Sequence, residues 1–301
     1  MVRDLRDGLT ASQRSVLRRL GSTDARSGRL ELSARVVAGG DESYAAAIAL
    51  AQPWTTRYPL LHGAGNLGSD EGDAPADPQY TELGLTPLGE AVLDGPVPTF
   101  FVNGPPHNLG EIAAGLLALI EDPVLDLHGL MAHVPGPDLP TGGVIVDAEP
   151  IREAYATGRG VLPMRPRFRV EQDASGRVSL VIDETPYGVG RSDFLRSIVE
   201  AVADRRVRGL VDLHHATGSP AVMTIAATME LDEILDQLDE HTAMRTLFEL
   251  NIEALVDDAP TTLPLLDAMR MWIDRVRTAG LVDRLRVLAD RFGDERRTEI
   301  S

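Results

Sequence analysis

The chain has no lysine and no cysteine in its 301 residues, so all 29 of its basic side chains are arginines. The absence of lysine excludes Schiff-base chemistry, a lysine general base and the P-loop type of phosphate clamp. The absence of cysteine excludes disulfides, thiolate nucleophiles and the common structural zinc sites, and it fits a reducing compartment. Any chemistry must therefore come from other side chains.

Long apolar runs and aromatic residues are also scarce. Apolar stretches are broken within about a dozen residues, short of the ~20 that a membrane-spanning helix needs, and no basic segment precedes an apolar run at Met1. Aromatic residues make up 4% of the chain, against 43% hydrophobic residues. We expect a cytoplasmic protein with no membrane segment and a core of Leu, Val, Ala and Ile.

Cations are missing from one long part of the chain. Residues 58–151 hold fourteen acidic residues and no Arg or Lys, so their only possible cations are four histidines. The whole chain carries 46 acidic and 29 basic residues, a formal net charge of −17. A stretch of this kind is a poor surface for the polyphosphate backbone of a nucleic acid.

Helical and extended segments alternate in the first part of the chain. A capping box from Thr10 to Gln13 predicts a helix that runs to Leu20. The apolar, β-branched run 30–37 predicts a strand, and the alanine-rich run 42–52 predicts a second helix. This alternation favours a helix-turn-helix or winged-helix module.

A change of pattern follows the two prolines Pro96 and Pro98, which mark a candidate domain boundary. Beyond them strands and helices alternate. Residues 161–170 are predicted to pair with 178–182 as a hairpin, and 192–206 form an amphipathic pattern typical of a helix.

The end of the chain is helical, because apolar residues recur every three or four positions, with a break at Gly280. Its apolar stripe fits either a helix packed on its own domain or a coil that seeks a partner. The sequence therefore predicts the α+β class, with a winged-helix domain at 1–98, an α/β domain at 99–260 and a terminal helix at 261–301.

Three patterns of known sites are rejected. Residues 63–68 match the GxGxxG dinucleotide pattern, but acidic residues and prolines follow, so no helix opens at the third glycine. His214 and His215 are neighbours on a predicted strand and point to opposite faces, so they cannot share a metal ion with Asp212. No GxSxG nucleophile elbow is present. We expect no metal site.

Ten short stretches, spread over most of the chain, carry a family signature. They are 2–9 (VRDLRDGL), 33–37 (SARVV), 51–54 (AQPW), 57–60 (RYPL), 63–69 (GAGNLGS), 80–82 (YTE), 105–109 (PPHNL), 129–138 (GLMAHVPGPD), 153–155 (EAY) and 157–160 (TGRG). In this order they resemble the breakage-reunion (A) subunit of DNA gyrase and topoisomerase IV, the bacterial type IIA DNA topoisomerases. The resemblance implies a winged-helix domain, then an α/β tower-like domain, then a terminal helix where the family's coiled coil begins, without the full coiled-coil gate.

The resemblance also implies a reaction. In the family, a tyrosine in an Arg-Tyr-Thr-Glu context attacks a DNA phosphodiester and becomes linked to the 5′ phosphate while a second duplex passes through the gate. Tyr80 stands at this position and is the candidate catalytic nucleophile, while Gln79 replaces the arginine. A B-type partner subunit supplies Mg²⁺ and the ATPase activity, so we expect this chain to bind no cofactor by itself.

Several departures weaken the implied reaction. A phenol with a pKa of about 10 is a weak nucleophile, so phosphoryl transfer depends on cations at the phosphate oxygens. The family presents a lysine, a histidine and two arginines from its first helix, where this chain has Thr10, Gln13, Arg14 and Ser15. Only Arg14 survives there, and it is a candidate DNA-binding residue together with Arg35.

Further DNA contacts of the family are missing. Its KYHPHGD segment is absent between residues 37 and 41, and the arginine of the next helix is Ala49 here. Most of the segment that carries its intercalating isoleucine is absent between residues 88 and 105. At least five DNA-facing cations are lost, and each neutralised phosphate contributes about 0.9 to the salt slope of DNA binding.

Three functional hypotheses remain open. The first is a degenerate gyrase A-like protein, impaired in DNA cleavage, that acts by contact with a gyrase B-type subunit or a full-length A subunit, or as a homodimer. The second is an active minimal ATP-dependent type II topoisomerase subunit that forms a Tyr80 phosphotyrosyl intermediate with a separate B subunit. The third is an acidic mimic of DNA, motivated by the cation-free stretch. The lost cations favour the first.

Overall fold

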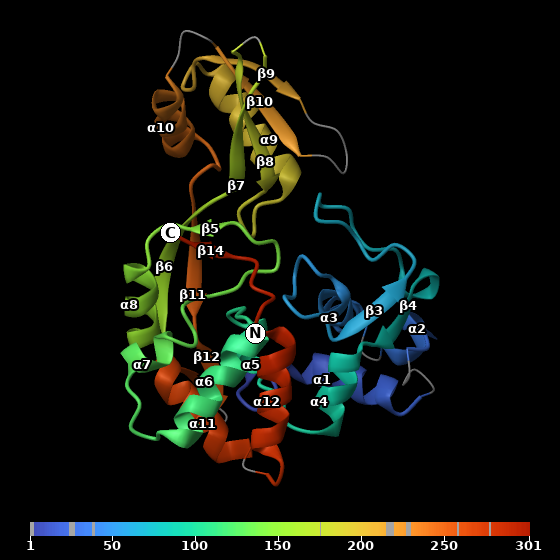
Figure 1. Ribbon diagram of the computed structural model, residues 1–301. Helices are drawn as coiled ribbons and strands as arrows, with labels where there is room; N and C mark the ends of the chain where they lie inside the picture. The colour runs from blue at the N-terminus through green and yellow to red at the C-terminus, as the bar shows by residue number, and fades with distance from the viewer. Residues whose placement is uncertain are drawn as a thin grey trace.

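The computed structural model describes residues 3–23, 28–37, 40–174, 176–214, 220–226, 230–257, 259–276 and 278–301. Helices and strands are mixed along this part of the chain, and its strands form four small sheets, which confirms the α+β class. Figure 1 shows a first unit at the lower right, a central unit at the lower left and an upper unit above it. Within the described residues, no helix has both the length and the apolar character needed to cross a bilayer.

The first unit packs helices against an antiparallel sheet of order β2-β4-β3. Its elements are α1 (Ala11–Gly21), β2 (Glu31–Leu32), α2 (Ser33–Val36), α3 (Asp41–Ala51), β3 (Leu61–Ala64), the 3₁₀ turn η1 (Pro78–Tyr80), β4 (Glu82–Leu85) and α4 (Pro87–Asp94). The predicted capping box is confirmed, because Thr10 Oγ1 accepts from Gln13 N at 3.2 Å and Gln13 Oε1 accepts from Thr10 N at 3.0 Å. The apolar face of α1 shares a core cluster with α3 and β4.

The strand predicted at 30–37 is wrong as a single element, because the chain divides there into β2 and the short helix α2. Ser33 begins α2, and its backbone N–H donates to the Thr81 carbonyl at 2.9 Å. This long-range bond turns the chain after Leu32 and overrides the β propensity of the valines. The winged-helix assignment of residues 1–98 stays a prediction.

The central unit is built around α6. Its elements are β1 (Arg3–Asp4), α5 (Phe100–Asn103), α6 (Leu109–Glu121), α7 (Leu127–Met131), β5 (Val144–Ile145), α8 (Glu149–Thr157), β6 (Arg159–Arg165), β11 (Thr246–Asn251), β12 (Glu253–Val256), β13 (Ala259–Thr262), α11 (Leu265–Val276), α12 (Leu281–Phe292) and β14 (Glu299–Ile300). Asn108 caps α6 by accepting from Glu111 N at 3.0 Å. A Cβ on Gly110 would lie 2.3 Å from Gly293 N, so glycine is needed where α12 ends against α6.

The terminal helical region predicted at 261–301 contains α11 and α12, divided at the predicted break at Gly280, and β14 follows them. Gly280 separates the two helices with a φ of +80°, a left-handed conformation that favours glycine. The apolar stripes of both helices are buried in the core around α6. The chain then returns to pair β14 with β5 in parallel. This burial favours the helix packed on its own domain over the coil that seeks a partner.

The upper unit is an antiparallel sheet of order β7-β8-β10-β9 with two helices. Its elements are β7 (Arg167–Gln172), β8 (Val178–Glu184), α9 (Arg191–Ala203), β9 (Leu210–His214), β10 (Ala221–Ile225) and α10 (Leu231–His241). The predicted pairing of 161–170 with 178–182 is correct only from residue 167 onward, because Pro166 lacks the N–H that a continuous strand needs. β6 and β7 therefore belong to different sheets.

One buried histidine makes the stability of the central unit depend on pH. His107 is fully buried, its Nδ1 lies 2.8 Å from the Phe101 carbonyl, and the Tyr155 hydroxyl donates to its Nε2 at 2.8 Å. Burial lowers the pKa of His107 to about 4. The unfolded chain then binds the proton first, so we expect stability to fall by about 3 kcal/mol as the pH falls from about 6.5 to 4.

Urea unfolding of the wild type and of His107→Gln between pH 8 and pH 4.5 measures this effect. The variant is less stable at pH 8 because it loses the Tyr155 bond, but the difference shrinks toward acid because the variant has no proton to take up. Glu111 acts in the opposite direction, since burial raises its pKa to about 7, and it is common to both proteins. Parallel pH profiles would show that His107 does not titrate as argued.

Candidate functional site

Tyr80 ends the 3₁₀ turn η1 directly before β4, and its side chain is 69% exposed. Among the residues that the structure describes, none forms a hydrogen bond with its hydroxyl. Gln79 is exposed beside it. In Figure 1 the chain between β3 and η1 extends from the first unit toward the upper unit. The tyrosine is therefore accessible to a large substrate.

Three hydroxyl groups fix the backbone next to Tyr80. The Thr81 hydroxyl is buried, donates to Ser33 Oγ at 2.9 Å and lies 2.9 Å from the Tyr44 hydroxyl. Tyr44 in turn donates to the Ala76 carbonyl at 2.6 Å. These bonds join η1 to α2 and α3, so the turn is held firmly while its tyrosine side chain stays free. Sequence reasoning missed Tyr44, because its partners lie far away along the chain.

A glycine on β3's continuation supports the same turn. Gly65 has a φ of +88°, and a Cβ there would lie 2.5 Å from the carbonyl oxygen of Tyr80. Only glycine combines this conformation with such a close approach. The segment rejected as a dinucleotide site thus has a structural role beside Tyr80.

Removing the Thr81 hydroxyl is expected to destabilise the first unit. Thr81→Val leaves the Ser33 hydroxyl buried without its partner, so we expect a loss of about 1–3 kcal/mol in the free energy of unfolding. Urea titration measures the loss. The matched control is Thr55→Val, whose hydroxyl bonds Gln52 on the surface, and for which about 0.5 kcal/mol or less is expected. Equal losses would contradict a positioning role for the buried hydroxyl.

Arg14 is already neutralised inside the chain. Its Nε and Nη2 donate to the two carboxylate oxygens of Asp7, both at 2.7 Å, and its Nη2 lies 3.4 Å from Asp4. The hydrogen bond from Asp7 raises the pKa of Arg14. A phosphate would therefore have to displace a carboxylate to bind this arginine.

Unlike Arg14, Arg35 has a guanidinium that is available to a ligand. It lies exposed on α2, which packs against η1. No described residue forms a hydrogen bond or ion pair with it. The structure thus brings the helix of Arg35, rather than a free Arg14, next to the turn of Tyr80.

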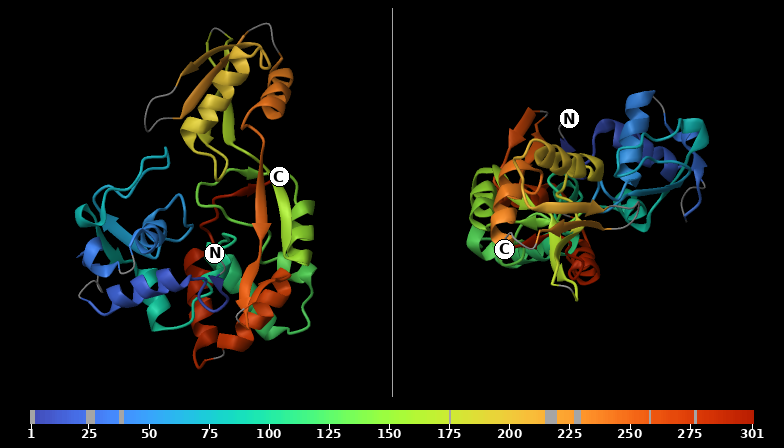
Figure 2. Two further views of the ribbon diagram at one scale, coloured as in Figure 1. Left: turned by 180° about the vertical axis from the view of Figure 1, so that it is seen from behind. Right: turned by 90° about the horizontal axis from the view of Figure 1, so that it is seen from above.

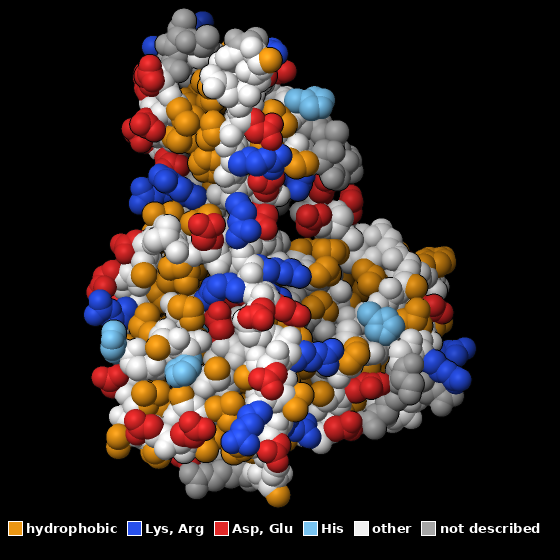
Figure 3. Space-filling model, in the orientation of Figure 1, with side chains coloured by type: hydrophobic (Ala, Val, Ile, Leu, Met, Phe, Trp, Pro, Cys, Tyr) orange, Lys and Arg blue, Asp and Glu red, His pale blue; other side chains and the backbone are white. Residues whose placement is uncertain are grey.

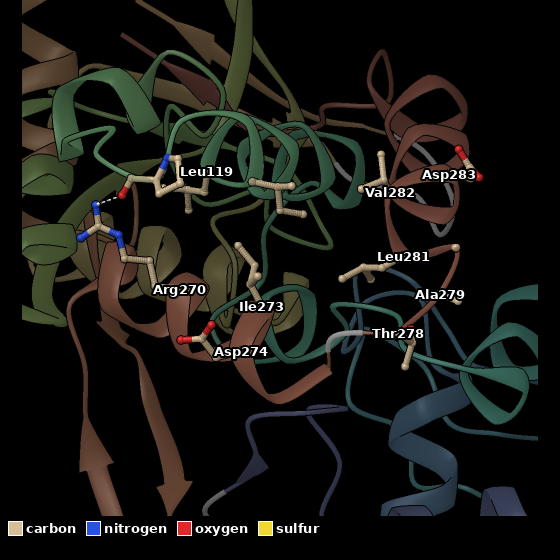
Figure 4. A pocket seen from close by; sticks show the side chains of 12 residues that line it. Leu119, Arg270, Ile273, Asp274, Thr278, Ala279, Leu281, Val282 and Asp283 are labelled. Atoms are coloured by element: carbon tan, nitrogen blue, oxygen red, sulfur yellow. Dashed lines mark hydrogen bonds between the residues drawn. The ribbon is translucent and has the colours of Figure 1, made fainter.

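A metal cluster, or basic side chains gathered on one face, would be a further candidate site in the part of the chain that the structure describes. No group of three His, Asp or Glu side chains within the described ranges could hold a metal ion, and His215 lies outside those ranges. On the face in Figure 3, basic and acidic side chains are interleaved. A cavity of about 710 Å³ lies between α6, α11 and the start of α12. Figure 4 shows the side chains that line it, and none of them belongs to a predicted site residue.

The chain is similar to known proteins over most of its length. The family model for the DNA gyrase/topoisomerase IV A subunit matches residues 2–103 and 98–296. The chain is 34% identical to the DNA gyrase A subunit of Mycolicibacterium smegmatis over 325 residues, 35% identical to that of Mycobacterium tuberculosis over 325 residues and 33% identical to that of Deinococcus deserti over 321 residues. Each match covers 90% of this chain and 39% of the relative.

Two features of these matches bear on the missing segments. The chain spans about two fifths of the length of these curated relatives, at 39%. The match of 325 residues is longer than the 301 residues of the chain, so the relatives carry extra segments inside the matched region. The family model also matches in two parts that overlap at residues 98–103, within the stretch 88–105 where the loss of a segment is predicted.

Proposed function

Because the chain belongs to the family of DNA gyrase and topoisomerase IV A subunits, we propose that it is a gyrase A-like protein with impaired DNA cleavage that acts by contact with topoisomerase subunits. The state of Arg14 carries this proposal. Of the cations expected on the first helix it alone remains, and Asp7 and Asp4 neutralise it. This pairing supports the loss of the role that the family resemblance implies for Arg14 at the DNA.

The chemistry at Tyr80 supports the same conclusion. Attack by its phenol oxygen requires loss of the hydroxyl proton and cations at the phosphate oxygens, where negative charge gathers. Gln79 is neutral, so it cannot replace the family's arginine in this role. Loss of one positioned donor typically costs on the order of 10²–10³ in rate. The retained tyrosine alone is therefore a poor catalyst.

The proposed partners are a gyrase B-type subunit or a full-length A subunit, with a homodimer as a further assembly. Mg²⁺ and ATP would enter through the B-type partner, as membership of the family implies. The charge pattern disfavours DNA as the main partner, because residues 58–151 contain no Arg or Lys.

A supercoiling assay tests the proposal. Increasing amounts of the chain are added to a complete gyrase of a related bacterium, and we expect inhibition that is equal for the wild type and Tyr80→Phe and that persists as salt is raised. Absence of inhibition at excess chain would contradict action through contact between subunits. Inhibition that weakens steeply with salt would favour the acidic DNA mimic instead.

A second function is favoured by the exposure of Tyr80. Its side chain is 69% exposed on a firmly held turn, as a nucleophile for DNA would be. In this second function the phenol oxygen bonds to phosphorus as the deoxyribose 3′ oxygen leaves, and Arg35 replaces the missing arginine. Tyr80→Phe would then abolish a covalent DNA adduct without lowering the free energy of unfolding.

A further inference from the structure

One strand of the central unit has a free edge. β11 lies at the end of the sheet β11-β6-β5-β14, and no strand among the described residues pairs with its outer edge. In the view from behind in Figure 2, β11 is the orange strand that runs down from the upper unit. An unpaired strand edge presents a row of backbone N–H and C=O groups that can pair with another chain.

The exposed face of this strand is also apolar. Leu247 on β11 is 69% exposed, and Val161 on the neighbouring β6 is 50% exposed. Antiparallel pairing places Leu247 opposite Pro163, close to Val161 on the same face. Free strand edges are normally protected by charges or prolines, so an edge beside large exposed apolar side chains favours a covering partner.

A groove runs beside the same edge, with a volume of about 240 Å³. Its lining includes Arg3, Tyr187, Phe248, Glu249, Asn251 and Glu253. Residues of β11 from both faces of the sheet contribute to it, which places the groove along the strand edge. The rings of Tyr187 and Phe248 pack edge to face, with their centroids 5.8 Å apart. They form an apolar wall of the groove.

Arg3 is an uncompensated cation in this groove. It is half-buried, and among the described residues its guanidinium makes one hydrogen bond, to the Gly8 carbonyl at 3.4 Å, and no ion pair. Burial lowers its pKa. Buried charges normally have a partner, so Arg3 is suited to a carboxylate from outside the chain. Glu249 and Glu253 line the groove without pairing with Arg3, and they suit a basic neighbour of that carboxylate.

We propose that the free edge of β11 and its groove are a docking site for an extended segment of a topoisomerase subunit, which adds a strand to the sheet and places a carboxylate against Arg3. The proposal rests on the proposed function and names the surface and the chemistry of the partner segment. Main-chain hydrogen bonds along β11 provide affinity, while Leu247 and Arg3 select an apolar and an acidic side chain. The strand edge fits an extended segment better than a helix.

Titration of the purified chain with the A and B subunits of a related bacterium's gyrase, each used separately, tests the site by measuring binding. Leu247→Lys puts a charge on the strand and is expected to weaken binding about tenfold or more. Arg3→Gln removes the cation and is expected to weaken it about tenfold. The matched control is Val287→Lys on α12, where Val287 is 63% exposed, and no change is expected.

The outcomes separate this inference from the function on which it rests. If the wild type binds either subunit, and if Leu247→Lys and Arg3→Gln bind as tightly as Val287→Lys does, the docking site is wrong and the proposed function stands. If the wild type binds neither subunit, both are wrong.

Hydrogen exchange provides a second readout, because backbone amides on the outer edge of β11 become protected in the complex. Self-association that Leu247→Lys abolishes, without binding of either gyrase subunit, would replace the partner segment with a second copy of the chain.

Discussion

Asp138→Ala is expected to destabilise the protein by about 3–5 kcal/mol, the cost of leaving a buried charge without its partner. Arg57 Nε donates to Asp138 Oδ2 at 2.8 Å, and the two side chains are 3% and 0% exposed. The other carboxylate oxygen accepts from the backbone N–H groups of Arg297 and Thr298 at 2.7 and 2.9 Å. The substitution therefore leaves the Arg57 guanidinium without its carboxylate partner. It also removes the acceptor that holds the segment before β14.

Equilibrium unfolding in urea measures this effect, with Glu149→Ala as the control. Glu149 pairs with Arg152 at 2.7 Å, but the side chains are 68% and 59% exposed, so a loss of only about 0–1 kcal/mol is expected. Asp138→Asn should fall between the two, since it keeps an acceptor for the backbone and loses the charge. A loss for Asp138→Ala no larger than that of the control would show that the buried pair does not hold the first unit to the end of the chain.

Duplex DNA is expected to bind this chain only in the non-specific range, with a Kd of about 10⁻⁴–10⁻⁶ M at physiological salt. Specific protein–DNA complexes reach about 10⁻⁸–10⁻¹¹ M, so the expected deficit is at least a hundredfold. The physical reason is the loss of DNA-facing cations and the pairing of Arg14 with Asp7. Fluorescence anisotropy of a labelled duplex between 50 and 200 mM salt measures affinity and salt slope together.

Returning cations to the surface is the matched control for this prediction. The triple variant Ser15→Arg, Ala49→Arg and Gln79→Arg places arginines at three positions where the resemblance expects them. Each restored phosphate contact should steepen the salt slope by about 0.9 and tighten binding. Submicromolar binding by the wild type with a steep slope would contradict the account of a lost DNA surface.

Elements with a strong local signal could be predicted from the sequence. The helix after Thr10 follows from its capping box, and the helix predicted at 192–206 follows from an apolar stripe that α9 buries at Phe194 and Ile198. Both signals are local, so they are readable without the fold. The predicted pairing of 161–170 with 178–182 was correct in part for the same reason.

Elements that depend on distant contacts could not be predicted in this way. α2 replaces a strand because Ser33 bonds Thr81, which lies far along the chain. The break at Gly280 between α11 and α12 was visible in the apolar pattern, but the packing of both helices around α6 was not. Pro166 was visible in the sequence, but the separation of β6 and β7 into different sheets was not.

In the candidate site, too, some features could be predicted from the sequence and others depend on the fold. Tyr80 and Gln79 came from the family resemblance, and the exposure of Tyr80 is now a structural fact. The neutralisation of Arg14 depends on how Asp7 folds back onto α1, which no spacing rule reveals. The roles of Tyr80, Gln79, Arg14 and Arg35 stay predictions until they are tested in solution.

Impaired cleavage of DNA is measured by the yield of a covalent adduct between Tyr80 and DNA. The chain is mixed with a B-type subunit of a related gyrase, Mg²⁺, ATP and supercoiled plasmid, and the reaction is stopped with detergent before protein-linked DNA is measured. We expect no adduct above background, with the wild type and Tyr80→Phe indistinguishable. Cleaved DNA linked to the wild-type chain and absent with Tyr80→Phe would contradict impaired cleavage.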